Sequence, residues 1–238
     1  MFFLEGESNY KLQITNYKLQ ITNYKLQITN YKLRIRNFEL QIMKSLGSLF
    51  FKYRSYIPIP FVIIMLIFMK PTLVSIITGF LIALSGELIR IWSVSFAGSE
   101  TRTTSGVGGT YLVTQGPYSI VRNPLYVGNI MIYVGLGIMS YALFPWLQIF
   151  ALFFFIFQYY CIILAEEEFL QSKFLQTFTD YKNSVSRFFP WFNTVPDKIK
   201  SKLSLKVKEG LKSERRSIQA FSITSVIIIV YYIYTITR

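Results

Sequence analysis

The chain has 238 residues, of which 52% are hydrophobic and 18% aromatic, and its mean hydropathy is +0.39. This composition is too apolar for an ordinary soluble domain and indicates a membrane protein. The net charge of +13 lies largely beside apolar segments, where lipid headgroups and the positive-inside bias account for it, so we exclude nucleic acid as a partner. A single cysteine, Cys161, and no histidine argue against a disulfide, a zinc site or a haem site.

A seven-residue repeat occupies residues 9–43. The unit Asn-Tyr-Lys-Leu-Gln-Ile-Thr begins at Asn9, occurs three times without change and then degrades towards Met43. Its apolar residues fit both a helical seam and an alternating strand. The DNA heptamer TACAAAT, read continuously through three copies, encodes the same seven residues. We therefore interpret residues 1–42 as a translated DNA repeat and Met43 as the functional start, with a genuine oligomerisation segment as the alternative.

Five apolar runs follow, compared with the roughly 20 residues that a spanning helix needs. The spacing of small residues in the second run, at Gly79, Ala83 and Gly86, predicts close helix packing. The short gap around Pro145 predicts a tight hairpin between the third and fourth runs. We therefore predict that residues 43–238 form an all-α, polytopic membrane helix bundle with about five transmembrane helices. The runs cover residues 55–69, 72–97, 125–141, 145–165 and 220–237.

Lysine and arginine residues are distributed unevenly around these runs. They precede the first run, occur in the loop after the second, and are dense between residues 173 and 216. Because positively charged loops tend to stay in the cytoplasm, we expect these three segments on the cytoplasmic side of the membrane. The basic juxtamembrane segment, residues 197–218, resembles an amphipathic helix that binds anionic lipid headgroups at 198–216. A polybasic linker is the alternative.

Two charged residues, Glu87 and Arg90, lie one helical turn apart in the second run. They can pair with each other and so lower the cost of placing charge near lipid. Alternatively, both extend to the cytoplasmic end of the helix, or they line a polar cavity.

Residues 112–128 place turn-forming and polar residues directly before the third apolar run. The Gly116-Pro dipeptide indicates a turn, and Asn123 before Pro124 predicts that the next helix starts at Pro124. Backbone amides at that start would suit a carboxylate, as would the planar guanidinium of Arg122. A helix cap beside an interfacial arginine explains the same residues without a ligand.

A second cluster follows the fourth apolar run. Three adjacent acids, residues 166–168, repel one another unless a cationic ligand or a basic partner lies nearby. A solvated helix end is the simpler interpretation. The glycine-rich segment 105–110, before the first cluster, lacks the strand and helix of a dinucleotide site and is interpreted as a connector.

Together, the two clusters resemble the signatures of the isoprenylcysteine carboxyl methyltransferase and phospholipid methyltransferase superfamily. In the first signature, G-P-Y-x-x-x-R-H-P-x-Y-x-G, only Asn123 departs, replacing the usual histidine. The second carries E-E-x-x-L, then F-G-x-x-Y-x-x-Y and a proline; Leu175 and Phe178 stand where glycine and tyrosine are usual. The resemblance covers residues 72–192. Matching residues are Gly116, Pro117, Tyr118, Arg122, Pro124, Tyr126 and Gly128, and then Glu166, Glu167, Leu170, Phe174, Tyr181 and Pro190.

The resemblance implies an integral-membrane methyltransferase that binds S-adenosyl-L-methionine in a cytoplasmic pocket within residues 98–192. Its catalytic candidates are Arg122, Asn123 and Tyr126, and no metal is implied. The two glutamates would attract the cationic groups of the cofactor, Arg122 its carboxylate, and the tyrosines its adenine or sulfonium. The cofactor-binding candidates are Gly116, Pro117, Tyr118, Arg122, Pro124, Tyr126, Gly128, Glu166, Glu167 and Tyr181.

The expected acceptor is a lipophilic molecule. A carboxylate is favoured because it is already ionised at neutral pH, whereas an amine must lose a proton and the chain has no histidine to take it. The expected reaction is therefore O-methylation of an isoprenylcysteine-like or other lipid carboxylate, with N-methylation of a phospholipid amine as the alternative. Two further alternatives are an NADPH-dependent enzyme of the sterol reductase type, which carries a similar R-H-P-N-Y signature, and a degenerate, non-catalytic membrane scaffold.

Overall fold

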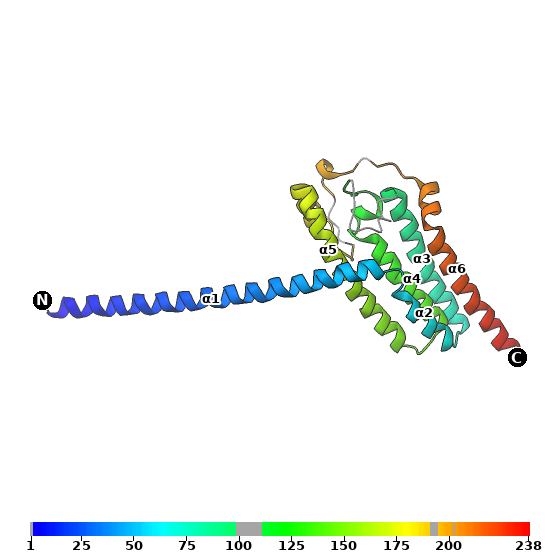
Figure 1. Ribbon diagram of the computed structural model, residues 1–238, viewed down its shortest axis with the longest axis horizontal. Coiled ribbons are helices and arrows are strands. Elements are labelled where there is room, and N and C mark those ends of the chain that lie inside the picture. Colours follow the sequence, from blue (N-terminus) through cyan, green and yellow to red (C-terminus); the bar gives the residue numbers. More distant parts are fainter. Residues whose placement is uncertain (1, 99–110, 191–194, 202) are drawn as a thin grey trace. The chain divides into compact units, whose positions relative to one another are not determined.

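The computed structural model describes residues 2–98, 111–190, 195–201 and 203–238, and helices dominate it (Figure 1). These ranges contain no β-strand and one isolated β-bridge, between Val121 and Ser186. The fold is an all-α bundle, as the apolar runs predicted. Its helices are α1 (Phe2–Tyr53), α2 (Pro58–Ile67), α3 (Leu73–Ala97), α4 (Pro124–Ser140), α5 (Trp146–Ser184) and α6 (Val207–Thr237), with short 3-10 helices η2 (Gly116–Ser119) and η3 (Asp197–Ile199).

The chain divides into two compact units, residues 1–45 and 46–238. In the first unit the repeat is helical and belongs to α1, so the helical seam prevails over the strand pattern. Apolar side chains such as Tyr17 and Ile21 are exposed along it. These exposed apolar side chains fit both a translated DNA repeat and an oligomerisation segment. The interpretation of residues 1–42 as a translated DNA repeat therefore stays a prediction.

Each of the five apolar runs forms a helix of the second unit or part of one. Three helices, α3, α5 and α6, are long and apolar enough to cross a membrane, and α2 adds a fourth span when it is counted with the helix before it. The apolar helix α4 has 17 residues, about 26 Å at 1.5 Å per residue, which is slightly less than a hydrocarbon core of about 30 Å. Among the described residues, three to four candidate spans therefore fit a membrane protein, with α4 as a shorter helix of the bundle.

Small residues bring α3 and α4 into backbone contact. A Cβ atom added at Gly86 would lie 2.6 Å from the carbonyl oxygen of Gly128, and one added at Gly135 would lie 2.5 Å from the backbone nitrogen of Ala83. Side chains at these positions would force the helices apart. The close packing expected from the Gly79, Ala83 and Gly86 spacing is confirmed.

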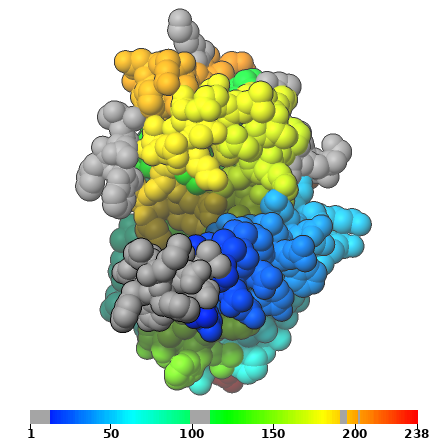
Figure 2. Space-filling view, turned by 90° about the vertical axis from the view of Figure 1, so that its left-hand side faces the viewer, coloured from blue at the N-terminus to red at the C-terminus, as the bar shows by residue number. Residues whose placement is uncertain are grey.

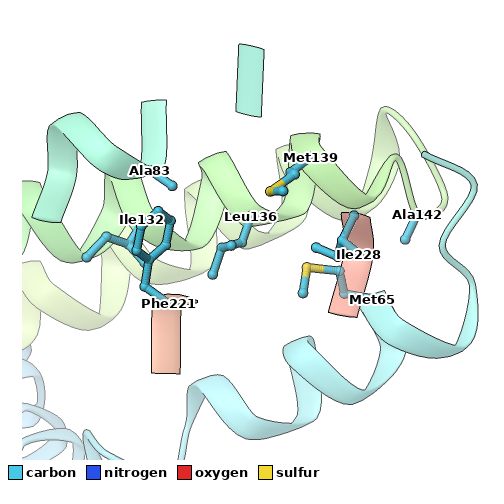
Figure 3. Packing of buried hydrophobic residues seen from close by; sticks show 8 residues of the cluster. All are labelled: Met65, Ala83, Ile132, Leu136, Met139, Ala142, Phe221 and Ile228. Atoms are coloured by element: carbon cyan, nitrogen blue, oxygen red, sulfur yellow. The ribbon is translucent and has the colours of Figure 1, made fainter. Parts of the chain in front are cut away.

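Two hydrophobic clusters hold α4 between its neighbours. One cluster joins α2, α3, α4 and α6, and the sticks in Figure 3 show its side chains pointing towards one another. The other packs α5 against α2 and α4 through aromatic rings; for example, the ring centroids of Tyr133 and Phe155 are 4.4 Å apart. The predicted hairpin joins α4 to α5 through residues 141–145. The first cluster contains Met65, Ala83, Ile132, Leu136, Met139, Ala142, Phe221 and Ile228.

The described residues of the basic segment before Val207 do not form the regular amphipathic helix that their spacing allowed. Thr114 Oγ1 donates to the carbonyl of Ile199 at 2.9 Å, and the backbone N–H of Ser201 donates to Thr114 Oγ1 at 2.8 Å. The N–H of Leu203 donates to Gln115 Oε1 at 2.9 Å. These tertiary hydrogen bonds satisfy backbone groups that a helix would otherwise use. Residues 203–206 are not helical, whereas residues 207–216 belong to α6, so the helical prediction for 198–216 is confirmed only in its second half.

A regular helix begins only at Val207 and continues as α6 into the last span. Its start is docked on the end of α3, where the N–H of Lys206 donates to the carbonyl of Ser95 at 2.9 Å. A Cβ added at Gly210 would lie 2.2 Å from Ser95 Oγ, so this glycine permits close approach. Figure 2 shows the orange segment that precedes α6 beside the yellow end of α5. Binding of this segment to anionic headgroups stays a prediction.

Helix α5 continues well past its apolar run, but one residue breaks its backbone. Leu175 has φ 46° and ψ −117°, a conformation that L-residues rarely adopt and that glycine adopts without strain. It occupies the position where the superfamily signature carries glycine. The backbone thus supplies a physical reason for glycine at that point of the signature.

Candidate functional site

The first signature folds as a turn followed by a helix start. Gly116 has a φ of +60°, which favours glycine, and an added Cβ would lie 2.4 Å from the Phe96 ring. Pro117 is buried in η2. Pro124 is the first residue of α4 and is also buried, which confirms the predicted helix start. These three signature residues set the path of the backbone.

The chain after α5 returns to this helix start. Val121 forms the β-bridge with Ser186, and the N–H of Arg122 donates to the Ser186 carbonyl at 2.8 Å. Asn123, the residue in place of the usual histidine, donates from Nδ2 to the carbonyl of Arg187 at 3.2 Å. The side chain of Asn123 therefore holds the returning chain against the start of α4.

The backbone amides at this start are partly engaged within the helix. The N–H groups of Tyr126 and Val127 both donate to the carbonyl of Asn123, at 3.1 and 3.2 Å. These two amides are therefore not directed at a ligand carboxylate in this structure, in contrast to the arrangement expected from the sequence.

Glu167 lies between two arginines. Arg122 Nη2 is 2.8 Å from its Oε1 and Arg187 Nη2 is 2.6 Å from its Oε2, and the Glu167 and Arg122 side chains are each only 9% exposed. Arg122 Nη1 also donates to the carbonyls of Lys182, at 2.9 Å, and Val185. Arg122 and Glu167 thus neutralise each other. Loss of Glu167 would leave the buried Arg122 without a carboxylate, at a cost of about 3–5 kcal/mol.

Arg187 had no role assigned from the sequence. It is 22% exposed, and its guanidinium carbon lies 5.0 Å from the centroid of the Tyr160 ring. Burial disfavours its charge, but the hydrogen bonds and charge of Glu167 outweigh burial and raise the pKa of Arg187. Arg187 lies beyond the aromatic pattern of the second signature, so no motif marked it as a site residue. Only the fold brings it to Glu167.

The two signatures meet at a second contact. Tyr126 Oη, on α4, donates to Glu166 Oε1, on α5, at 2.6 Å. The Tyr126 ring stacks on Tyr159 with centroids 4.6 Å apart. Tyr181 Oη donates instead to the carbonyl of Tyr118 at 2.7 Å. Tyr126 and Glu166 are therefore a paired unit, whereas Tyr181 anchors the turn of the first signature.

Gly128 lies apart from these polar groups, in the backbone contact between α3 and α4. An added Cβ there would meet Gly86 at 2.7 Å and Arg90 at 2.6 Å. Its contacts are therefore with α3 rather than with α5. The glycine-rich segment 105–110, interpreted as a connector, falls outside the residues that the structure describes.

Glu87 and Arg90 do not form the pair that their spacing allowed. Arg90 Nε donates to Glu214 Oε2 of α6 at 3.2 Å, and Arg90 Nη1 donates to Asn129 Oδ1 of α4. Glu87 Oε2 accepts a hydrogen bond from Ser217 Oγ at 2.8 Å. Both charges are thus directed at α6 rather than at each other, forming a polar cluster that joins three helices.

Residues 74–177 match the phospholipid methyltransferase family. The matched segment contains nearly all of α3, the turn of the first signature, α4 and the greater part of α5. It includes Arg122, Tyr126, Glu166 and Glu167, so the Arg122–Glu167 and Tyr126–Glu166 contacts both lie within it.

Two curated bacterial proteins are similar to part of this chain. The cobalt-zinc-cadmium resistance protein CzcN of Cupriavidus metallidurans is 36% identical over 101 residues, which is 42% of each protein. The nickel-cobalt-cadmium resistance protein NccN of Alcaligenes xylosoxydans xylosoxydans is 41% identical over 86 residues, 36% of this chain and 39% of the relative. The chain thus spans about two fifths of the length of these curated relatives. No solved structure matches it.

Proposed function

We propose that this chain is an integral-membrane methyltransferase that transfers a methyl group from S-adenosyl-L-methionine to a lipophilic acceptor. The observation that carries the proposal is the contact between Tyr126 and Glu166, 2.6 Å, which joins the two signatures inside the segment that matches the phospholipid methyltransferase family. Glu166 directly follows the apolar sequence of α5. A polar site at the end of apolar helices suits an enzyme that binds a water-soluble cofactor and a lipid together.

The side chains at this position fit the charges of the cofactor. S-adenosyl-L-methionine supplies an electrophilic methyl group on a sulfonium and also carries an ammonium and a carboxylate. In its ionised form Glu166 would attract the cationic groups, and the stacked rings of Tyr126 and Tyr159 offer π-faces to a cation. Arg187, the more exposed of the two arginines on Glu167, is our candidate for the carboxylate.

Arg122 and Glu167 have a different proposed role. Because they are paired and buried, we assign them to the frame that holds the start of α4 against α5, together with Asn123. This frame fixes the distance between Tyr126 and Glu166 of α5. Gly116, Pro117, Tyr118, Pro124, Gly128 and Tyr181 shape the same region through the turn and helix contacts described above.

Methyl transfer from a sulfonium disperses charge, so alignment of the reacting groups and exclusion of water supply much of the rate. A lipid carboxylate is already ionised and needs no base. We therefore favour O-methylation of an isoprenylcysteine-like or other lipid carboxylate. N-methylation of a phospholipid amine would use the same site but requires a proton acceptor, for which Glu166 is our candidate.

We also propose that this end of α4 and α5 faces the cytoplasm. The support is the concentration of lysine and arginine in the segments that flank this end of the helices. A cytoplasmic site would have direct access to a soluble, nucleotide-derived cofactor.

Calorimetric titration of the full chain in detergent with S-adenosyl-L-methionine tests the proposal. Two acids two positions apart give a matched pair of variants: Glu166→Gln removes the carboxylate that Tyr126 holds, and Glu168→Gln removes an exposed acid nearby. We expect saturable binding by the parent and by Glu168→Gln. Affinity should fall about 10- to 100-fold in Glu166→Gln, the effect of losing one interaction with a charged group.

The same titration with NADPH separates the rival functions. Binding of NADPH without S-adenosyl-L-methionine would support the sterol reductase type of enzyme instead. Binding of neither compound by a monodisperse, folded chain would support the non-catalytic scaffold. If Glu166→Gln and Glu168→Gln lose affinity equally, the cofactor does not bind at the Glu166 carboxylate. The chain would still be a methyltransferase, with its cofactor site elsewhere.

A further inference from the structure

Helix α1 carries two rows of apolar side chains along the first unit. The helix is unbroken (Figure 1), and its seven-residue repeat brings similar residues to the same side in each heptad. In the first row isoleucine alternates with an aromatic residue at steps of three and four, and each side chain is 38–68% exposed. The second row is leucine, at every seventh position. The first row is Ile14, Tyr17, Ile21, Tyr24, Ile28, Tyr31, Ile35, Phe38 and Ile42, and the second is Leu19, Leu26, Leu33 and Leu40.

The two rows lie on opposite sides of α1. Leu19, for example, is two positions after Tyr17 and two before Ile21, and two positions turn an α-helix through about 200°. A helix that lies flat on lipid presents one broad apolar face, which these separate rows do not supply. The narrow first row instead has the spacing of a coiled-coil seam, with isoleucine at heptad position a and an aromatic residue at position d.

The strict period of the first row fits a second helix with the same period. In a straight helix, a row that repeats every seven residues drifts by about 20° per heptad. Two helices with this repeat keep their rows in contact by winding round each other in a left-handed supercoil. The row extends over four heptads, from Ile14 to Ile42, which is long enough to indicate a coiled coil. A second copy of this chain supplies the matching row.

Charges beside the seam specify a parallel pair in register. In such a pair, each position g faces position e of the next heptad on the other helix, five residues further along the chain. Arg34 is at g and Glu39 is at e, so Arg34 of each copy faces Glu39 of the other. The preceding pairs join glutamine to lysine, so no like charges meet in them. They are Gln13 with Lys18, Gln20 with Lys25, and Gln27 with Lys32.

Other arrangements bring like charges together. In an antiparallel pair position e faces position e, and three of the four e residues in this range are lysine. A parallel pair shifted by one heptad places Arg34 of one copy opposite Lys32 of the other. The departures from the repeat unit at Arg34 and Glu39 therefore favour one orientation and one register.

We propose that residues 14–42 associate with the same residues of a second copy of this chain as a parallel, in-register, two-stranded coiled coil. Isoleucine at position a favours two strands. The proposal is independent of the methyltransferase function. It is also compatible with a DNA repeat as the origin of residues 1–42, because a seven-residue repeat has the coiled-coil period whatever its origin.

Two matched pairs of substitutions in the full chain test the seam. Ile21→Lys with Ile28→Lys puts charge into the first row, and Leu19→Lys with Leu26→Lys puts the same charge into the second row. Lysine is a good helix former, so neither variant opposes the helix itself. Light scattering coupled to size-exclusion chromatography in mild detergent gives the molar mass of each protein over a range of concentrations.

We expect the parent and the leucine variant to be dimers. In the isoleucine variant the dissociation constant should rise at least about 100-fold, because like charges replace buried isoleucines on both helices. A monomeric parent overturns the proposal. An isoleucine variant that dimerises as tightly as the parent overturns it too, as does equal weakening in both variants.

Exchange of charges tests the orientation and the register. Arg34→Glu and Glu39→Arg each place like charges opposite one another twice in the dimer, and each should raise the dissociation constant about 3- to 10-fold. The double variant restores opposite charges only in a parallel, in-register pair, so its dissociation constant should return to within about twofold of the parent. If the double variant is no tighter than the single variants, the parallel, in-register arrangement is wrong.

Discussion

Replacing Leu175 with glycine tests the break in α5. The residue has φ 46° and ψ −117° inside an otherwise continuous helix, and its side chain is 65% exposed. Side chains also complete the hydrogen bonding at the break, since Gln171 Nε2 donates to the Leu175 carbonyl at 2.9 Å and Thr179 Oγ1 donates to it at 3.2 Å. The break is therefore part of the fold, and the strain of a non-glycine residue at positive φ should be measurable.

The magnitude follows from comparing glycine with alanine at this position. Both substitutions remove the same leucine contacts, but alanine keeps the Cβ and hence the strain, about 1–3 kcal/mol. Glycine removes the strain and loses about 0.5–1 kcal/mol through the greater freedom of the unfolded chain. We therefore expect Leu175→Gly to be more stable than Leu175→Ala by about 1 kcal/mol, or roughly 2–4 °C in the unfolding midpoint.

A thermal unfolding series in detergent provides the assay. Ser172, exposed on a regular turn of the same helix, supplies the control, because there alanine should be more stable than glycine by about 1 kcal/mol. The expected result is thus an inversion of the glycine and alanine order between positions 172 and 175. If alanine is the more stable residue at both positions, the reasoning from backbone strain is refuted.

The remaining predictions concern buried groups in the second unit. Gln158 is fully buried, and neither of its amide atoms has a hydrogen-bond partner in the described part of the chain, so Gln158→Leu should raise the unfolding midpoint by roughly 2–8 °C; a lower midpoint would contradict this. Gly135→Leu should prevent correct assembly of the bundle, because even a Cβ would lie 2.5 Å from the backbone nitrogen of Ala83. A variant that is stable and monodisperse in size-exclusion chromatography would argue against this contact. Glu214→Gln should destabilise by about 3–5 kcal/mol by leaving Arg90 without its carboxylate, whereas adding Arg90→Met should recover most of that loss; a double variant as unstable as the single one would show that the pair is not the cause.

Local sequence was sufficient where backbone preference decides the structure. Proline cannot donate a backbone hydrogen bond and has a fixed φ, so the start of α4 at Pro124 was predictable. The turn at Gly116 follows from the freedom of glycine at positive φ. A close helix contact of α3 was also predictable, because Gly79 and Gly86 recur at helical spacing, although the sequence did not name α4 as the partner.

Local sequence was not sufficient where distant groups compete for the same hydrogen bonds. The spacing of Ile199 and Leu203 favoured a helix, but Thr114 and Gln115 bind the backbone near them, and the regular helix begins only at Val207. Likewise, one helical turn favoured a Glu87 pair for Arg90, which instead reaches residues on two other helices. In both cases a tertiary contact outweighed a local pattern that was worth a few tenths of a kcal/mol per pair.

By itself, the sequence determined that this protein is a membrane helix bundle, and it identified the two motifs that carry polar residues at the ends of apolar helices. Hydropathy and turn residues act through burial and local backbone geometry, so they can be read along the chain. Only the tertiary structure decided which polar groups pair. Arg122 and Glu167 are 45 positions apart and Tyr126 and Glu166 are 40 apart, and a charge–charge or hydrogen-bond contact depends on distances in space that no local pattern specifies.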